Sequence, residues 1–210
     1  FENCSGLRDI TLPTGLRTIG DRAFENCFWM SSIDIPQSAI DIGSSVFKGC
    51  YMLQHIRLPD AIKDIRQIFR GCNGLQEAAL PQGVTEVPDF AFEGCSVLQS
   101  VSIPESVTRV GEGAFKGCEF YLQEISLPDG VVELGAGAFE NCRVLKSFEL
   151  PSGLTEIPER AFEGCRDLER ISIPESITRI GDHAFGRIYS TESIEIPQSV
   201  TQLGKGVFYG

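Results

Sequence analysis

The chain has 210 residues, of which 42% are hydrophobic and 22% charged, as is typical of a globular protein. A net charge of −11 makes nucleic acid a poor partner, because such a surface repels phosphate backbones. We expect no membrane insertion, since no segment approaches the ~18 apolar residues of a membrane helix. The two histidines are too few for a site built on several imidazoles, and the eight cysteines alone do not decide among disulfides, zinc sites and other uses.

A 23-residue repeat runs through the whole chain. Phenylalanine, cysteine and proline recur together at this interval, with the phenylalanine three residues before the cysteine. The phenylalanines are Phe1, Phe24, Phe47, Phe69, Phe92, Phe115, Phe139, Phe162, Phe185 and Phe208. The cysteines are Cys4, Cys27, Cys50, Cys72, Cys95, Cys118, Cys142 and Cys165. One residue is missing near Arg66–Gln67 and one is added near Glu119–Tyr121, so the two changes cancel.

One unit, from Leu98 to Cys118, shows how the repeat should fold. Val101 and Ile103 alternate with polar residues, which predicts a half-buried strand. Pro104 follows and ends that strand, because proline has no N–H to donate. A second short extended segment is expected at 107–110, and a helical or 3₁₀ turn at 114–118.

The apolar residues of one unit cannot be buried within 23 residues, but stacked units can cover one another. The sequence therefore predicts an α/β-type repeat solenoid of about nine 23-residue coils, with short β-strands and helical or 3₁₀ turns, forming one domain over residues 1–210. Neither end carries a polar capping unit or a signal peptide. We expect a fragment of a longer array, or end-to-end self-association through the uncapped coils.

The repeat pattern L-x-x-I-x-[IL]-P-x-x-V-x-x-[IV]-G-x-x-A-F-x-x-C resembles the BspA-like, or treponemal-type, class of leucine-rich repeats. The resemblance covers essentially the whole chain. It implies a cell-surface or secreted protein of a bacterium or protist, engaged in adhesion and in recognition of host or matrix proteins. Thr191 in the leucine position and Ile188 in the cysteine position depart from the pattern.

The cysteines are interpreted as one interior column. Equivalent positions in stacked coils hold their Cβ vectors parallel and nearly 5 Å apart, which suits a disulfide poorly. A linear column also does not converge on a tetrahedral metal. We expect eight free thiols that pack as small apolar groups, with some disulfides or a metal site as the alternatives. Ile188 in the ninth position fits a packing role.

A structural ladder of phenylalanines and cysteines should therefore line the interior of the array. Its members are Phe24, Phe47, Phe69, Phe92, Phe115, Phe139, Phe162, Phe185, Cys27, Cys50, Cys72, Cys95, Cys118, Cys142 and Cys165.

The residues directly after each cysteine vary between coils and are the candidate ligand-binding positions. They are polar or small in several units but aromatic or large in others, and equivalent positions should stack along one edge. The candidates are Phe28, Trp29, Tyr51, Met52, Phe120, Tyr121 and Tyr189. An exposed apolar cluster with tryptophan and tyrosine indicates an interaction site. The alternative is that these side chains fold down to cover the rim of the core.

The polar column of the first strands is a second candidate surface, since repeat proteins bind through such extended sheets. It comprises Thr11, Asp34, Arg57, Ala79, Ser102, Ser126, Glu149, Ser172 and Glu195. This mixture suits protein or glycan contact, and a plain solvated face equally well.

We expect no enzyme activity, no cofactor and no metal. His55 and His183 lie several coils apart, and the serines have no His–Asp partner. The predicted function is a non-catalytic module that binds a protein or glycan ligand. The alternative is a structural spacer or self-associating segment without a specific ligand.

Overall fold

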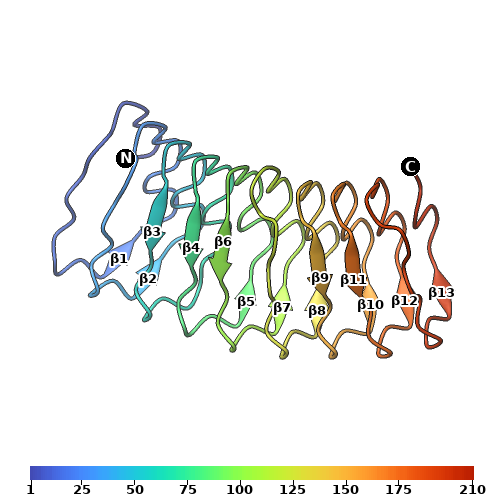
Figure 1. Cartoon of the computed structure of the whole chain (residues 1–210). Coiled ribbons are helices and arrows are strands. Elements are labelled where there is room, and N and C mark those ends of the chain that lie inside the picture. The colour runs from blue at the N-terminus through green and yellow to red at the C-terminus, as the bar shows by residue number, and fades with distance from the viewer.

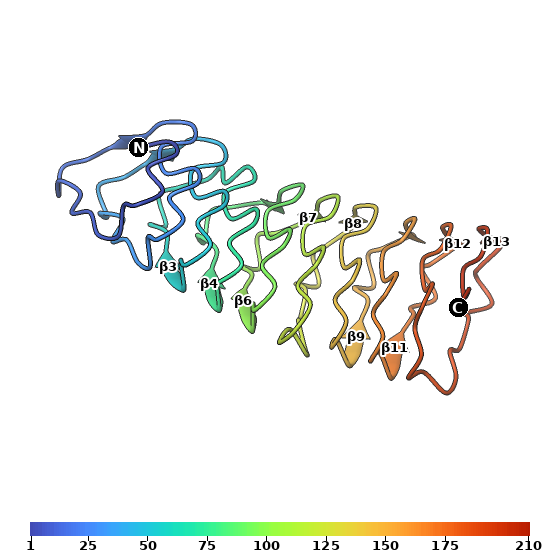
Figure 2. The same cartoon turned by 90° about the horizontal axis from the view of Figure 1, so that it is seen from above.

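The computed structural model describes all 210 residues, Phe1 to Gly210. The chain winds into a row of similar coils, with its two termini at opposite ends (Figure 1). Figure 2 shows the coils following one another in sequence order along the array. This arrangement confirms the predicted solenoid. We number the coils by residue: 5–27 for coil 1, then 28–50, 51–72, 73–95, 96–118, 119–142, 143–165, 166–188, and 189–210 for coil 9.

The first strand of the repeat forms one column of parallel strands, the first-strand sheet. Its members are β3 (His55–Arg57), β4 (Glu77–Ala79), β6 (Ser100–Ser102), β9 (Ser147–Glu149) and β11 (Arg170–Ser172). β3, β4 and β6 pair in one group, and β9 pairs with β11 in another. The middle residue of each strand, such as Ile56 or Phe148, points into the core, while its two neighbours face outward.

The second extended segment forms the second-strand sheet, also parallel. Its members are β1 (Thr18–Ile19), β2 (Asp41–Ile42), β5 (Glu86–Val87), β7 (Arg109–Val110), β8 (Glu133–Leu134), β10 (Glu156–Ile157), β12 (Arg179–Ile180) and β13 (Gln202–Leu203). These strands pair in three groups: β1 with β2, β5 through β8, and β10 through β13.

Neither sheet is continuous, so the prediction of two extended segments in every unit is too regular. The second-strand sheet has no strand in coil 3, the coil that lacks a residue near Arg66–Gln67. The first-strand sheet is broken between β6 and β9, at coil 6, which carries the extra residue near Glu119–Tyr121. One residue more or fewer moves the backbone N–H and C=O groups out of register with the neighbouring coil.

The segment before each cysteine is an isolated hydrogen-bonded turn rather than a helix. In coil 5, the Lys116 N–H donates to the Gly113 carbonyl at 3.0 Å and the Cys118 N–H to the Phe115 carbonyl at 3.2 Å. Gly113 and Gly117 have φ of 54° and 75°. These left-handed residues stop the turn from continuing into a helix. The chain contains no helix, and therefore none long and apolar enough to cross a membrane.

The phenylalanine column lies inside the array as a continuous stack. Successive ring centroids from Phe1 to Phe208 are 5.2 to 6.2 Å apart. The widest spacing, Phe47–Phe69, and the largest tilt in the column, 30° between Phe69 and Phe92, both involve the phenylalanine of the shortened coil 3. Its members from Phe24 to Phe185 belong to a single core cluster of 53 buried residues, whereas Phe1 and Phe208 at the two ends are exposed.

All eight cysteines are free, with Cys4 exposed and the other seven buried. Each buried thiol donates a hydrogen bond to the phenylalanine carbonyl of the preceding coil. The Cys72 Sγ lies 3.0 Å from the Phe47 oxygen, for example, and the Cys95 Sγ lies 3.2 Å from that of Phe69. Burial raises the pKa of the Cys50 thiol to about 12 and raises the pKa of Cys72 and Cys118 as well. These thiols are therefore protonated, unreactive donors at neutral pH.

Candidate interaction surfaces

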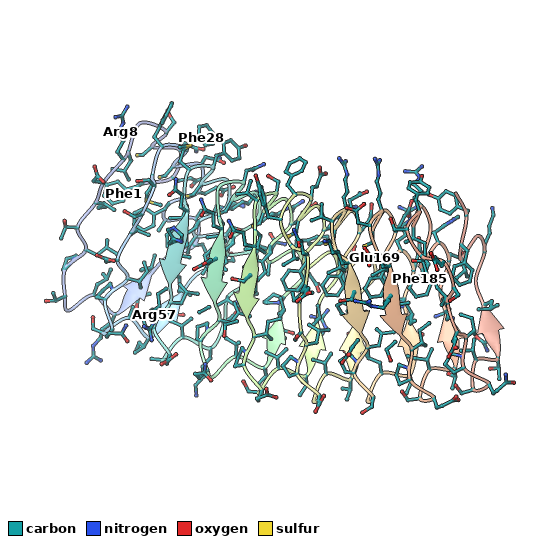
Figure 3. The ribbon with its side chains drawn as sticks, in the orientation of Figure 1. Phe1, Arg8, Phe28, Arg57, Glu169 and Phe185 are labelled. Atoms are coloured by element: carbon teal, nitrogen blue, oxygen red, sulfur yellow. The ribbon has the colours of Figure 1, made fainter.

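The predicted aromatic residues of coils 2 and 3 lie exposed along one edge. Trp29 is 55% exposed, Tyr51 48% and Met52 42%, while Phe28 is half-buried. Figure 3 shows Arg8 and Phe28 at this edge, near the N-terminal end of the array. The Trp29, Tyr51 and Met52 side chains therefore do not fold down over the core. We call Phe28, Trp29, Tyr51 and Met52 the aromatic edge.

The aromatic edge is ordered by contacts within and between coils. The rings of Phe28 and Tyr51 stack with centroids 4.9 Å apart and an angle of 6° between their planes. The Arg8 guanidinium lies 5.6 Å from the centre of the Trp29 ring, within cation–π range. The Met52 N–H donates to the Phe28 carbonyl at 3.2 Å. The edge therefore presents a flat apolar surface with one cation beside it.

Glycine in coil 4 limits the aromatic edge on its C-terminal side. A Cβ atom on Gly74 would lie 2.5 Å from the Tyr51 carbonyl oxygen, so only glycine fits at this close approach. Asn73 and Gly74 occupy the positions that are aromatic in coil 2. The large side chains of the edge therefore end at coil 3.

The remaining predicted binding residues are exposed but separate from this edge. Phe120 and Tyr121 in coil 6 are 52% and 54% exposed, and Tyr189 in coil 9 is 61% exposed. Two coils lie between coil 3 and coil 6, and two more between coil 6 and coil 9. The structure thus brings only the four residues of coils 2 and 3 together.

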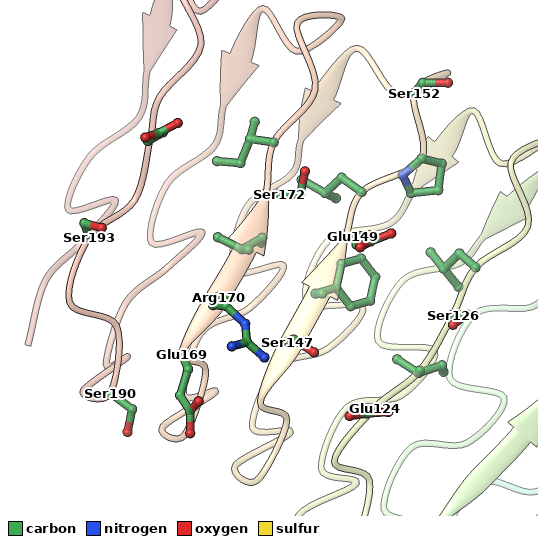
Figure 4. Close-up of a pocket in the computed structure, with 18 of the residues that line it drawn as sticks. Glu124, Ser126, Ser147, Glu149, Ser152, Glu169, Arg170, Ser172, Ser190 and Ser193 are labelled. Carbon is green, nitrogen blue, oxygen red and sulfur yellow. The ribbon is translucent and has the colours of Figure 1, made fainter.

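The first-strand sheet carries a groove over coils 6 to 9 that the sequence reading of one polar column did not single out. β9 and β11 form its centre, with segments of coils 6 and 9 on either side (Figure 4). Each coil presents one charged residue and one serine, in alternating order. We call these eight residues the strand-face groove: Glu124, Ser126, Ser147, Glu149, Arg170, Ser172, Ser193 and Glu195. Reading both outward positions of each strand together would have revealed this alternation.

The charges of the strand-face groove have no ion-pair partner within the chain. Across the β9–β11 pair, Arg170 stands opposite Ser147 and Glu149 opposite Ser172. No ion pair within 4 Å involves any of the charged groove residues. With the lining residues Asp129, Glu169 and Glu192 included, the groove has six carboxylates and one guanidinium, a net charge of −5.

The outward charges of the second-strand sheet show the opposite arrangement. Arg109 lies between Glu86 and Glu133 in the sheet register, and it bonds both, at 3.1 and 2.9 Å. It also bonds Asp89 at 2.7 Å. Burial alone would lower the pKa of Arg109, but the hydrogen bonds to Asp89 and Glu133 outweigh it and raise the pKa. At these positions of the second-strand sheet the chain neutralises its own charges.

The histidines lie on different parts of the array, as their spacing predicted. His55 is exposed in β3 and lines a smaller hollow on the first-strand sheet with Arg57 and Glu77. His183 packs edge-on against the Tyr209 ring, with ring centroids 4.8 Å apart, in the turn of coil 8. No group of three or more His, Cys, Asp or Glu side chains is placed to hold a metal ion.

The repeat pattern and the stacked coils agree with one known family. A model of the BspA type leucine rich repeat region, in six copies, matches residues 1–121 and 119–210. The chain belongs to the BspA-type leucine-rich repeat family. The resemblance seen in the sequence is confirmed. A search of curated proteins found no significant match.

Solved structures place this BspA-type array among bacterial leucine-rich repeat proteins. A leucine-rich repeat protein from Bacteroides ovatus is 27% identical, with a TM-score of 0.77 over 100% of this chain and 66% of that chain. The leucine rich repeat protein of T. pallidum is 29% identical, with a TM-score of 0.58 over 85% of this chain and 72% of that one. A leucine rich cell surface protein from Faecalibacterium prausnitzii shares the fold at 24% identity and a TM-score of 0.55, over 93% of this chain and 74% of that one. This chain spans slightly less than two thirds of the Bacteroides ovatus protein.

Proposed function

We infer that this BspA-type array is a non-catalytic protein-binding module of the cell surface or of a secreted protein, and that it contacts its ligand through the aromatic edge. One observation carries the proposal: large aromatic side chains are held exposed and stacked in coils 2 and 3, where other coils have polar or small residues. Ordered, exposed tryptophan and tyrosine are the residues that dominate protein interfaces. The surface location rests on the family resemblance.

The chemistry of the edge indicates the kind of ligand it suits. The stacked Phe28–Tyr51 pair and the Trp29 ring offer flat apolar area at a small cost in side-chain entropy. Arg8 adds a cation beside the Trp29 ring, on a chain that is otherwise strongly acidic. A protein surface with aromatic or aliphatic side chains next to a carboxylate complements this arrangement.

Trp29 is the only tryptophan in the chain, so its fluorescence reports on the proposed site alone. Peptides displayed on phage would be selected on the wild-type protein and counter-selected on the Trp29→Ala/Tyr51→Ala variant. We expect survivors rich in apolar residues beside Asp or Glu, which shift Trp29 emission to the blue and protect it from acrylamide. Binders that leave Trp29 emission unchanged, or an absence of edge-dependent binders, would contradict the proposal.

The alternative function is a spacer or a self-associating segment. Parallel strands of neighbouring coils pair along both sheets, and the same pairing between two copies would produce self-association. Light scattering over a range of protein concentrations distinguishes the two functions. A mass that grows with concentration and is unaffected by Trp29→Ala/Tyr51→Ala would indicate self-association through the coil ends.

A further inference from the structure

The strand-face groove is a second surface, distinct from the aromatic edge in both position and chemistry. It extends over four coils and encloses about 1470 Å³, more than the ~300–1,000 Å³ of a typical small-molecule site. It is open to solvent along its length, and its outward side chains are serines and charges without aromatic residues. A polymer lying across several coils fits this shape better than a compact ligand does.

The charges of this groove are available for a partner because of the strand register. Arg170 faces Ser147, and Glu149 faces Ser172, so charged residues meet serines across the strands. Directly opposed Glu and Arg, as in Glu156–Arg179 on the other sheet, form an ion pair at 2.9 Å. The alternation on the first-strand sheet prevents such pairing and leaves the carboxylates facing solvent.

The spacing of the carboxylates distinguishes between cationic partners. No group of three or more acidic, histidine or cysteine side chains in the chain converges on a point where a metal ion would bind. Glu149 and Glu195 occupy the same position two coils apart, which at the ~4.8 Å strand spacing separates their backbones by roughly 10 Å. A peptide in the extended polyproline II conformation advances about the same distance in three residues, at ~3.1 Å per residue, and its side chains point the same way every third residue. Cationic side chains distributed along such a peptide can therefore meet separate carboxylates.

We propose that the strand-face groove of coils 6 to 9 binds an extended polypeptide segment rich in lysine or arginine. Glu124, Glu149 and Glu195 receive the cationic side chains, and the serines between them hydrogen-bond the peptide backbone. Arg170, unpaired at the centre, repels a cation at its own position. The ligand consequently carries a neutral or acidic residue there, and Arg170 sets its register in the groove.

Two short fluorescein-labelled peptides test this proposal by fluorescence anisotropy at low salt. One has lysine at every third position with glycine between, and the other has glutamate in place of each lysine. Glu149→Gln/Glu195→Gln should weaken binding of the lysine peptide by about fivefold or more. Asp41→Asn/Glu112→Gln removes the same number of exposed, unpaired acids elsewhere, so it controls for net charge and should have less than about a twofold effect.

Arg170→Ser provides a gain of affinity that no misfolded variant would produce. It should tighten binding of the lysine peptide by about threefold or more, because it removes the one repulsive charge. Trp29→Ala/Tyr51→Ala should leave this binding unchanged, so failure of the groove and failure of the aromatic edge are told apart. Three results would overturn the proposal. The first is that Asp41→Asn/Glu112→Gln weakens binding as much as Glu149→Gln/Glu195→Gln does. The others are that Arg170→Ser weakens binding of the lysine peptide, or that the glutamate peptide binds as tightly as the lysine peptide.

Discussion

Phe24 and Phe28 are four residues apart, yet they belong to two aromatic columns with opposite environments. Phe24 is buried in a stack that runs through the array, and Phe28 is half-buried in a stack with Tyr51 that ends within two coils. The ring separations are similar, at 5.7 and 4.9 Å. Position within the coil, rather than residue type, therefore decides whether an aromatic residue supports the core or is presented to a partner.

The largest loss of stability is expected when the buried thiols of the interior ionise at high pH. Burial raises the pKa of Cys50 to about 12 and raises that of five other cysteines, whereas unfolded thiols ionise near their ordinary pKa of 9. Because the folded chain holds these protons more tightly than the unfolded chain, their contribution to the free energy of unfolding is constant below about pH 9. It is lost as pH rises toward 12. For Cys50, each pH unit in that interval costs about 1.4 kcal/mol.

We therefore expect the denaturant midpoint to fall steeply above about pH 9, with complete unfolding before the folded pKa of Cys50, about 12, is reached. Urea titrations followed by far-UV circular dichroism across this interval would measure the decline. Cys72→Ala should make the decline shallower, because it removes one buried ionising group. A midpoint that stays constant through this interval would show that the cysteines ionise equally well in the folded and unfolded chains, and hence that solvent reaches them in the folded state.

Truncation of an interior ring should be the most destabilising single substitution. Phe115 is fully buried between Phe92 and Phe139, with centroids 5.3 and 5.2 Å away. Phe115→Ala leaves a cavity in the stack and should lower the free energy of unfolding by roughly 3–5 kcal/mol. Chemical denaturation measures this loss, with Tyr121→Ala as an exposed aromatic control from the next coil. A loss below about 1 kcal/mol would mean that the coils rearrange to fill the space.

The two sheets should respond differently to loss of an arginine. Arg109→Ala leaves Glu86, Asp89 and Glu133 without their shared cation and should cost about 1 kcal/mol. Arg170→Ala breaks no ion pair and should change stability by less than about 0.5 kcal/mol. Thermal denaturation at low and high salt compares the two variants. Only for Arg109→Ala should the difference in melting temperature from wild type shrink as salt rises. Equal losses would place Arg170 in an ion pair.

The smallest effect is expected at the aromatic edge. Trp29→Ala/Tyr51→Ala removes side chains that are 55% and 48% exposed and fill no core position. The melting temperature should change by less than about 2 °C, in contrast to the interior rings. Differential scanning calorimetry provides the measurement, with Phe47→Ala as the interior comparison. A loss as large as that of Phe47→Ala would assign the edge to the core and weaken the binding proposal.

The regular features of the fold were predictable because the same residue types recur at equivalent positions in successive repeats. Val101 alternating with polar residues predicted β6, and Val107 with Val110 predicted the segment that contains β7. The turn before Cys118 was predicted to be closed by glycine, and Gly117 ends it with a positive φ. The positive φ of Gly113 and Gly117 shows only in the folded backbone, where it prevents a helix.

The two surfaces were less predictable from the sequence. The residues of the aromatic edge were identified by their contrast with neighbouring coils, but the sequence left open whether they cover the core. Exposure depends on how much of the core the strand and turn already enclose, which is a property of the packed coil. The groove was missed as a unit because its serines and charges stand at two strand positions, and their opposition across β9 and β11 arises only from pairing of coils.

By itself, the sequence determined the period, the family and the interior columns, since buried positions accept few side chains and repeat them in every coil. Tertiary structure decided what varies on the outside. It exposed Trp29 beside Arg8, bonded Arg109 to its neighbours, and left Arg170 and Glu149 without partners. Outward side chains are not restricted by burial, so their roles depend on which residue the next coil places opposite them.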